Sequence, residues 1–434
     1  MTSATRFVLE NDPDYDFALE IVKKLQEAGY TAYWAGGCVR DFLMQKRPKD
    51  YDVATSALPD QVRELFGFKK TVAVGAAFGV IIVHAHERHV ADVEVATFRT
   101  DLDYHDGRRP SGVVFSTPEE DAERRDLTFN GLFYDPVAQQ IHDFVGGQAD
   151  LKNGIVRAIG KPADRFEEDK LRLLRTIRFA AHLGFQIEPA TWQAICANAT
   201  MLKTVSAERI SQELRRMLVD PNRVEAVRLL TESGLLNASG LTAEDQQVET
   251  QDLKWSLAMK TLAELQSPSF PLALAVLQRS LTYSELESRE VNQQRLAEQG
   301  RELRLSNQEI DHATWLVLHH KELADPQKRS LAELKRLLIS PYTEDFLKWE
   351  AAAAIAAGES LAEYEFLQEF LTNTPEEVLN PPPLLGGHDL LEAGIPGGPE
   401  MKELLDKIRD AQLNLEITNR EEALALLTRL KAAE

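Results

Sequence analysis

The chain has 434 residues, of which 44% are hydrophobic and 27% charged, a composition typical of a globular protein with several domains. Its 69 acidic residues against 49 lysines and arginines give a net charge of −20, which disfavours tight non-specific binding of nucleic acid over the whole surface. No apolar run approaches the ~20 residues of a membrane span, so we expect a protein that does not bind membranes. Cys38 and Cys196 are interpreted as buried apolar side chains without a disulfide, which favours the reducing cytoplasm.

The first part of the chain alternates short apolar runs, expected as strands, with amphipathic stretches, expected as helices. An amphipathic pattern over 14–28 predicts a first helix, and Gly29 is its expected stop. The following elements are expected as strands at 32–35, 51–54, 71–74, 79–84 and 92–98, and as helices near 40–45 and at 59–66.

Helical patterns dominate after residue 144, where 155–159 is the one further strand candidate. Helices are expected at 164–183, 189–197, 207–218 and 223–233, followed by a loop over 234–247. The predicted fold class is therefore an α+β head, with a small mixed or antiparallel sheet and helices, followed by an all-α neck, body and tail.

One short segment carries the strongest chemical signal in the chain. The pair Gly36-Gly37 permits close approach of a phosphate to the backbone, and Arg40 adds a fork of donors nearby. Asp50 and Asp52 are expected to project from one face of a strand, where paired carboxylates suit Mg²⁺. A glycine turn or an Asp-x-Asp strand edge alone is usually structural, but their proximity favours a nucleotide-transfer site.

Polar side chains recur in later apolar stretches. Arg124, Asp126 and Asn130 suit contacts with phosphate and ribose. Glu94, in an expected strand, is a candidate third carboxylate, although an exposed or ion-paired glutamate is an equally good interpretation.

Five stretches resemble, in order, the motifs of the class II tRNA nucleotidyltransferases, the family of CCA-adding enzymes and bacterial poly(A) polymerases. They are motif A at 36–41 with 50–52, motif B at 124–130, motif C at 147–157, motif D at 168–172 and motif E at 208–214. The resemblance covers roughly the first half of the chain. It implies an enzyme that adds C and A nucleotides from CTP and ATP to the 3′ end of tRNA without a template.

The resemblance also assigns roles to residues. Asp50 and Asp52 are expected to bind Mg²⁺, with Glu94 as the candidate third catalytic group. The expected nucleotide-binding residues are Gly36, Gly37, Arg40, Arg124, Asp126, Asn130, Asp169, Arg172, Arg175 and Arg178. Asp169 and Arg172, three residues apart and so expected on one helix face, would read the base of the nucleotide. Arg175 and Arg178 continue that face and would hold Asp169 or meet the tRNA.

Together these signals predict a division into four parts. We expect a catalytic nucleotidyltransferase head at 1–145, a helical neck for nucleotide selection at 146–235, a helical body at 236–380 and a helical tail for tRNA contact at 381–434. The basic residues concentrate near 108–125 and 157–178, which predicts a local basic cleft in an acidic protein. The oligomeric state is left open.

Several alternatives stay open within and outside the family. An enzyme that adds only A or only CC, or a poly(A) polymerase, would carry similar motifs. The stretch 99–110 resembles a mobile loop that the family uses when it changes from C to A addition, and 74–80 is more similar to the tRNA enzymes than to the polymerases. A catalytically inactive RNA-binding protein is the alternative of another class, and the intact aspartates argue against it.

Overall fold

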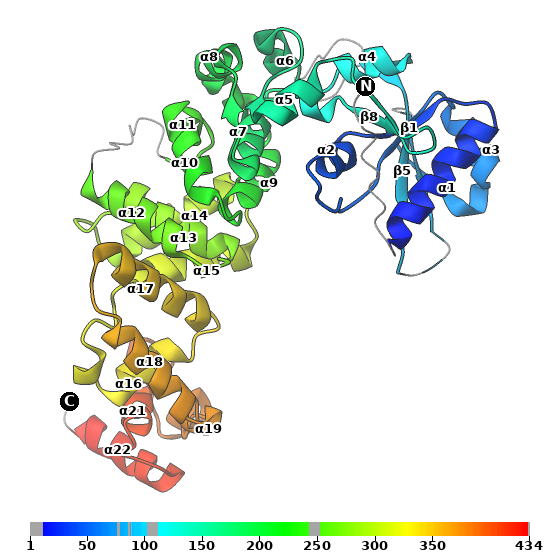
Figure 1. Ribbon diagram of the computed structural model, residues 1–434. Coiled ribbons are helices and arrows are strands. Elements are labelled where there is room, and N and C mark those ends of the chain that lie inside the picture. Colours follow the sequence, from blue (N-terminus) through cyan, green and yellow to red (C-terminus); the bar gives the residue numbers. More distant parts are fainter. Residues whose placement is uncertain are drawn as a thin grey trace. The chain divides into compact units, whose positions relative to one another are not determined.

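The computed structural model describes residues 12–75, 79–85, 87, 89–101, 112–242 and 252–432, which divide into two compact units, Met1–Glu244 and Asp245–Glu434 (Figure 1). Most of the stretch 99–110 and the middle of 74–80 lie outside the described residues, so the expectations for these two stretches stay predictions.

The first unit begins with a seven-stranded sheet of order β3-β4-β5-β2-β1-β8-β9. Its strands are β1 Ala32–Ala35, β2 Val53–Thr55, β3 Thr71–Gly75, β4 Val80–Val83, β5 Val93–Thr97, β8 Phe133–Asp135 and β9 Gln140–His142. Neighbouring strands are antiparallel except β2 and β5, which are parallel with Val53 opposite Val95. The expected small mixed sheet is confirmed.

Helices cover this sheet and surround its core. Helix α1, Pro13–Glu27, contributes buried apolar side chains that pack against Trp34 of β1, and α3 is Pro59–Phe66, as expected. Helix α2, Gly37–Leu43, begins earlier than the expected 40–45 because Gly36 already makes the turn. The shorter α4, Pro118–Glu123, and the strand pair β6 Arg99–Asp101 with β7 Val113–Phe115 were not expected.

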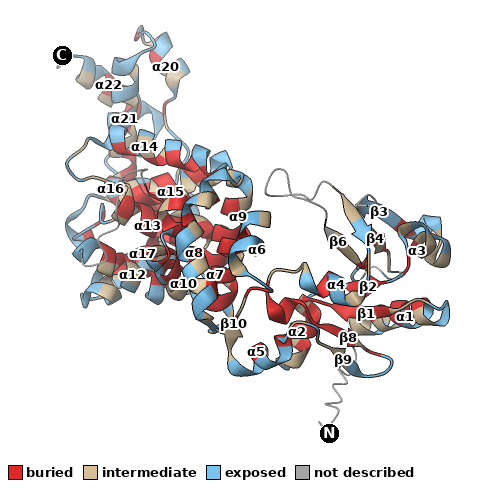
Figure 2. Cartoon of the chain, turned by 90° about the horizontal axis from the view of Figure 1, so that it is seen from above, coloured by how far each residue is buried: buried red, intermediate tan, exposed pale blue. Residues whose placement is uncertain are grey.

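A helical segment completes the first unit. Its helices are α5 Gly147–Asn153, α6 Pro162–Glu168, α7 Arg172–Leu183, α8 Pro189–Asn198, α9 Ala207–Leu218, α10 Arg223–Glu232 and α11 Leu235–Ala238. Helix α7 packs against α9 and α10, and in Figure 2 its buried side is part of the red interior. A short parallel pair, β10 Ile155–Val156 and β11 Gln186–Ile187, also lies here, and only β10 was expected.

Two predictions about this segment are wrong. The single helix expected at 164–183 is interrupted between α6 and α7, because Asp169 adopts an extended conformation, with φ −137° and ψ 103°, and ends α6. The loop expected at 234–247 contains the short helix α11. The interruption matters for function, since it falls inside the expected base-reading motif.

The second unit is helical throughout residues 252–432. Its helices are α12 Leu253–Glu264, α13 Phe270–Leu281, α14 Arg289–Glu302, α15 Asn307–His319, α16 Leu331–Leu338, α17 Thr343–Ala357, α18 Ala362–Asn373, α19 Glu376–Leu379, α20 Gly387–Glu392, α21 Pro399–Leu413 and α22 Arg420–Ala432. The last three share an apolar core that includes Leu390, Leu404 and Leu427. Among the described residues, no helix combines the length and the apolar character needed to cross a membrane.

The two cysteines differ in environment. Both are free thiols, but Cys38 is buried in α2 whereas Cys196 is exposed on α8. The expectation of two buried cysteines is therefore wrong for Cys196, which faces solvent on a helix whose buried positions are Thr191 and Ile195.

Candidate active site

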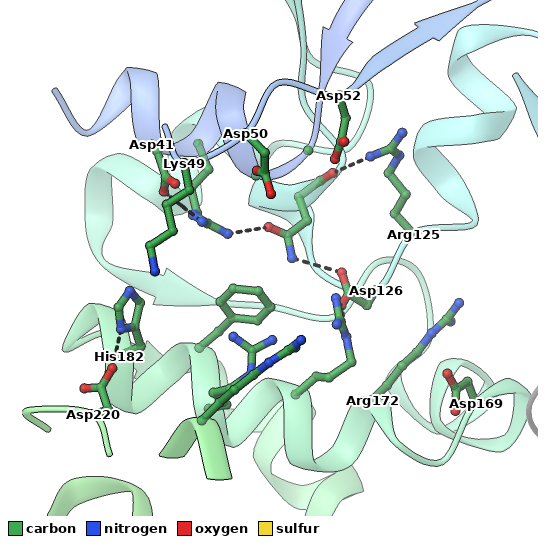
Figure 3. A pocket seen from close by; sticks show the side chains of 18 of the residues that line it. Asp41, Lys49, Asp50, Asp52, Arg125, Asp126, Asp169, Arg172, His182 and Asp220 are labelled. Carbon is green, nitrogen blue, oxygen red and sulfur yellow. Dashed lines mark hydrogen bonds and ion pairs between the residues drawn. The ribbon is translucent and has the colours of Figure 1, made fainter. Parts of the chain in front are cut away.

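The first unit contains a cavity of about 1020 Å³ between the sheet and the helical segment (Figure 3). Its lining includes every expected site residue except Glu94. Eight lysines and arginines and six aspartates line it, so the cavity is rich in cations although the chain carries a net charge of −20. Five of the basic residues behind the predicted basic cleft line this cavity, namely Arg124, Arg125, Arg172, Arg175 and Arg178. Arg108 and Arg109 lie outside the described residues.

Gly36 makes the turn from β1 into α2. Its φ of +69° and ψ of −122° lie where a side chain is strained, and an added Cβ would meet Arg125 Nη1 at 3.0 Å. Gly37 follows as the first residue of α2, and both glycines line the cavity. Because neither glycine has a side chain, the backbone is accessible at this edge of the cavity, and room remains for a ligand.

Asp50 and Asp52 precede β2 and do not lie on it, which corrects the expected strand placement. The alternation still holds, because Tyr51 between them is buried and both aspartates are exposed. The amide of Ala35 donates to the carbonyl of Asp52 at 3.0 Å and so continues the β1–β2 ladder. Figure 3 shows both carboxylates at the cavity.

The carboxylate of Asp52 lies in a negatively charged environment. Solvent reaches it through the cavity, yet desolvation by the surrounding protein, with the charges of Asp50 and Glu94, raises its pKa to about 6 despite the opposing effect of Arg125. Glu94 is exposed on β5, whose register places it beside Asp52, but it is not part of the cavity lining. A divalent cation would relieve this accumulation of negative charge.

A chain of hydrogen bonds crosses the floor of the cavity (Figure 3). Arg40 Nη1 donates to Asn130 Oδ1 at 3.1 Å, and Asn130 Nδ2 donates to Asp126 Oδ1 at 3.1 Å. Asp126 also accepts from Arg175 Nε at 2.8 Å. Burial alone would raise the pKa of Asp126, but Arg175, Asn130 and Arg172 outweigh burial and hold that pKa far below its usual range. Asp126 is therefore ionised.

Arg124 and Arg125 share an acidic partner that the sequence did not reveal. The two guanidinium groups contact the carboxylate of Asp121, in α4, at 2.7 and 2.9 Å. Asp121 is buried, and the two arginines keep its pKa below the ordinary value against the effect of burial. This clamp fixes both arginines at the edge of the cavity.

Asp169 and Arg172 are not on one helix face, which corrects the sequence-based geometry. Asp169 ends α6, and its Oδ1 accepts from the amide of Leu171 at 3.1 Å. Arg172 opens α7, where it donates to Glu168 at 2.8 Å and to the carbonyl of Arg124 at 2.9 Å. Both side chains nevertheless line the same cavity.

The side chain that holds Asp169 comes from α9. Arg209 Nη2 lies 2.8 Å from Asp169 Oδ2. Arg175 and Arg178, which were expected as possible supports for Asp169, pair instead with Asp126 at 2.7 Å and with Glu213 at 2.5 Å. Arg209 lies in the 208–214 stretch that resembles motif E, so this stretch contacts Asp169 directly.

One aromatic ring organises the arginines of the cavity. The guanidinium carbons of Arg40, Arg175 and Arg178 lie 5.1, 5.6 and 4.1 Å from the centre of the Phe179 ring. Cation–π attraction offsets part of the repulsion between these charges. Phe179 was not expected at the site, nor were the other lining residues His182, Arg216, Val219, Asp220 and Pro221. Asp41, Lys49 and Arg125 lie within or beside the motifs singled out in the sequence, although no individual role was assigned to them. Continuing the helical spacing of 172, 175 and 178 by one turn would have found His182.

Comparisons with known proteins agree with this architecture. The family described as Poly A polymerase head domain matches residues 32–157, and the one described as probable RNA and SrmB-binding site of polymerase A matches 184–239. The CCA-adding enzyme of Geobacillus stearothermophilus is 33% identical over 94% of this chain and 95% of its own length. That of Lactobacillus johnsonii is 31% identical over 96% and 98%.

A solved structure extends the agreement to three dimensions. The crystal structure of the Bacillus stearothermophilus CCA-adding enzyme in complex with CTP is 30% identical, covers 97% of this chain and 98% of its own, and superimposes with a TM-score of 0.73. The head domain and these relatives define the class of protein, which is a nucleotidyltransferase. Within that class, the chain belongs to the family of the CCA-adding enzymes.

Proposed function

We propose that this protein completes the 3′ end of tRNA with C, C and A, taken from CTP and ATP, and releases pyrophosphate at each step. The observation that carries the proposal is the cavity itself, which brings paired carboxylates, a row of arginines and the Asp169–Arg172 pair together in one unit. Its relatives over nearly the full length are CCA-adding enzymes. A cytoplasmic location follows from tRNA as the substrate.

Asp50 and Asp52 are the residues that would hold Mg²⁺. Both supply hard oxygen donors on one side of the chain. The raised pKa of Asp52 indicates that its negative charge is poorly compensated, and a cation bound there would stabilise the ionised carboxylate. When bound, the metal favours ionisation of the attacking 3′-hydroxyl and neutralises charge on the leaving pyrophosphate. Within the described residues, no three or more His, Cys, Asp or Glu side chains are grouped as a metal site, so the role of Glu94 stays a prediction.

The other residues of the cavity would bind the nucleotide. Arg40, Arg175 and Arg178 present guanidinium groups suited to the triphosphate, near the glycine turn. Gly36, Gly37 and Arg124 border the same space, and Asp126 with Asn130 suits the ribose hydroxyls.

Asp169 and Arg172 would select the base. A carboxylate accepts from the exocyclic amine that both cytosine and adenine carry, and a guanidinium donates to a ring nitrogen or carbonyl oxygen. Uracil and guanine present a carbonyl oxygen where that amine would be, so they are rejected. The contacts of Asp169 with Arg209 and of Arg172 with Glu168 fix both groups before the nucleotide arrives.

The remaining assignments of parts belong to the same proposal. Residues 1–145 act as the catalytic head, 146–235 as the selecting neck, 236–380 as the body and 381–434 as the tail that contacts tRNA. The family matches at 32–157 and 184–239 support the first two.

The test is nucleotide addition to a tRNA that lacks its 3′ CCA. The purified protein is given CTP, ATP or both, and the products are sized at nucleotide resolution. We expect two additions with CTP alone and three with both nucleotides. Products that stop at CC, a single A added only to CC-ended tRNA, or long A tails would instead identify the narrower enzymes or a poly(A) polymerase, and no product would indicate a binding protein.

A further inference from the structure

Helix α7 presents one continuous polar face to the cavity. Arg172, Arg175, Arg178 and His182 all line it, and their spacing of three, three and four residues places them on one side of the helix. The ten residue steps from Arg172 to His182 span about 15 Å along the axis. With the base of the nucleotide at Arg172, the opposite end of the ligand points toward His182.

The imidazole of His182 is held in a defined orientation (Figure 3). Its Nδ1 lies 2.6 Å from Asp220 Oδ2, in the turn between α9 and α10. Asp220 Oδ1 accepts from the amide of Asn222 at 2.8 Å, and Asn222 Nδ2 donates back to the carbonyl of His182 at 3.3 Å. Since Nδ1 is occupied by Asp220, the nitrogen offered to a ligand is Nε2.

The surroundings of His182 suit an anion. Lys49, from the segment before β2, and Arg216, from α9, line the same cavity, and Arg178 lies one turn away on α7. Two of the acidic groups that line the cavity are already paired, Asp41 with Arg40 and Asp220 with His182. The His182 side chain is 49% exposed and Asp220 only 16%, so the histidine is the accessible member of the pair.

We propose that His182, oriented by Asp220, donates a hydrogen bond from Nε2 to the terminal phosphates of bound CTP or ATP and to the pyrophosphate that leaves. This inference rests on the proposed function. The 3′-oxygen of the tRNA bonds to the α-phosphorus while the bond from that phosphorus to the bridging oxygen breaks, and pyrophosphate departs with the electron pair. The proton of the 3′-hydroxyl passes to water. His182 contributes a hydrogen bond from Nε2 while Nδ1 stays bound to Asp220, and it transfers no proton in this step.

The first test measures inhibition by pyrophosphate and by CMP in CCA addition. For His182→Ala we expect the inhibition constant of pyrophosphate and the KM for both CTP and ATP to rise about tenfold, as for the loss of one hydrogen bond to a charged group. CMP lacks the terminal phosphates, so its inhibition should stay within about twofold. The KM for tRNA and the preference for C over U should not change.

Three further variants complete the test. His182→Gln keeps a donor at a similar reach and should recover part of the pyrophosphate affinity, and it replaces the alanine variant if that one does not fold. Asp220→Asn keeps the shape but weakens the orienting contact, so it should give an intermediate loss. His89→Ala, an exposed histidine between β4 and β5 that does not line the cavity, is the matched control and should behave as the wild type.

The outcomes separate this inference from the proposed function. Calorimetric titration with pyrophosphate and Mg²⁺ needs no tRNA, so it tests the role of His182 independently of nucleotide addition. If the wild-type protein added no nucleotide, that result would overturn only the proposed function. An active His182→Ala variant with unchanged pyrophosphate affinity would overturn the inference. So would a rise confined to the KM for tRNA, because His182 would then contact the RNA end.

Discussion

Arg209 of α9 and Asp169 at the end of α6 form an ion pair with 2.8 Å between Nη2 and Oδ2. The pair is partly shielded, with 19% of the Arg209 side chain and 17% of the Asp169 side chain exposed. It joins two segments 40 residues apart in the chain and fixes the carboxylate proposed to read the base. The proposed selection of the base would therefore depend on a side chain, Arg209, that need not touch the nucleotide.

The first prediction is that Arg209→Ala relaxes base choice more than it slows addition. Without the guanidinium, the Asp169 carboxylate loses its fixed position, and we expect misincorporation of U to rise about tenfold while C addition falls less than about threefold. Competition between CTP and UTP measures this. Arg209→Lys keeps the charge and should restore part of the selectivity, and Asp169→Ala should relax selection at least as much. Unchanged selectivity in Asp169→Ala would refute the proposed reading role.

The second prediction concerns catalysis by the paired carboxylates. Asp52→Ala should abolish nucleotide addition and leave the fold intact, because the variant removes one of the two proposed ligands for Mg²⁺. Circular dichroism and thermal unfolding check the fold, and product sizing checks the activity. Glu94→Gln is the informative companion: near-normal activity would leave Glu94 as an electrostatic neighbour, whereas loss comparable to Asp52→Ala would make it a third catalytic carboxylate.

The third prediction concerns stability against pH in the absence of metal. The pKa of Asp52 is raised to about 6 in the folded protein, so ionisation costs more in the folded than in the unfolded state and destabilises the fold as pH rises through about 6. Asp52→Asn should therefore have the wild-type Tm near pH 4 and a higher Tm than the wild type at pH 7 to 8 in EDTA. Thermal scans with EDTA test this, and Mg²⁺ should stabilise only the wild type. A Tm difference that did not change with pH would contradict the raised pKa.

The fourth prediction concerns Asn130, which joins Arg40 to Asp126. Asn130→Ala leaves a buried guanidinium and a largely buried carboxylate each without one partner, so we expect a loss of about 1–3 kcal/mol in the free energy of unfolding and higher KM values for both nucleotides. Urea unfolding and steady-state kinetics measure the two effects. Asn198→Ala, which removes a local bond to the carbonyl of Ala194, is the control and should cost less than about 1 kcal/mol.

The fifth prediction is that the native protein has one reactive thiol per chain and consumes one equivalent of a thiol reagent. Cys196 is exposed, whereas Cys38 is buried and desolvation raises its pKa to about 12. A chromogenic disulfide titration should therefore count one thiol in the native state and two after denaturation. Cys196→Ser should reduce the native count to zero, and a second reactive thiol in that variant would contradict the burial of Cys38.

The sequence predicted the long elements and the chemistry better than the details of geometry. The first helix and those at 59–66 and 207–218 fall within a residue or two of their expected positions, because periodic apolar spacing over two or more turns is a strong signal. Strands of three residues such as β8 and β9 were missed, since so short a run carries no period.

What the sequence could not show is tertiary pairing. The ion pair of Asp169 with Arg209 and the contact of His182 with Asp220 each depend on how separate helices pack. The clamp of Arg124 and Arg125 on Asp121 is different, because it is a local contact between residues three and four apart. The interruption after Glu168 was missed for a related reason. An aspartate that ends a helix and one inside it look alike in a helical pattern, and the choice is made by partners elsewhere in the fold.

The interruption between α6 and α7 exposes backbone groups that an unbroken helix would have satisfied. Asp169 takes up the amide of Leu171, and Arg172 takes up the carbonyl of Arg165. The two side chains proposed to discriminate between bases thus also hold the two helix ends in place. Replacing either residue would therefore remove a helix-end contact together with a proposed base contact, so a change of nucleotide preference at these positions would also lower the stability of the fold.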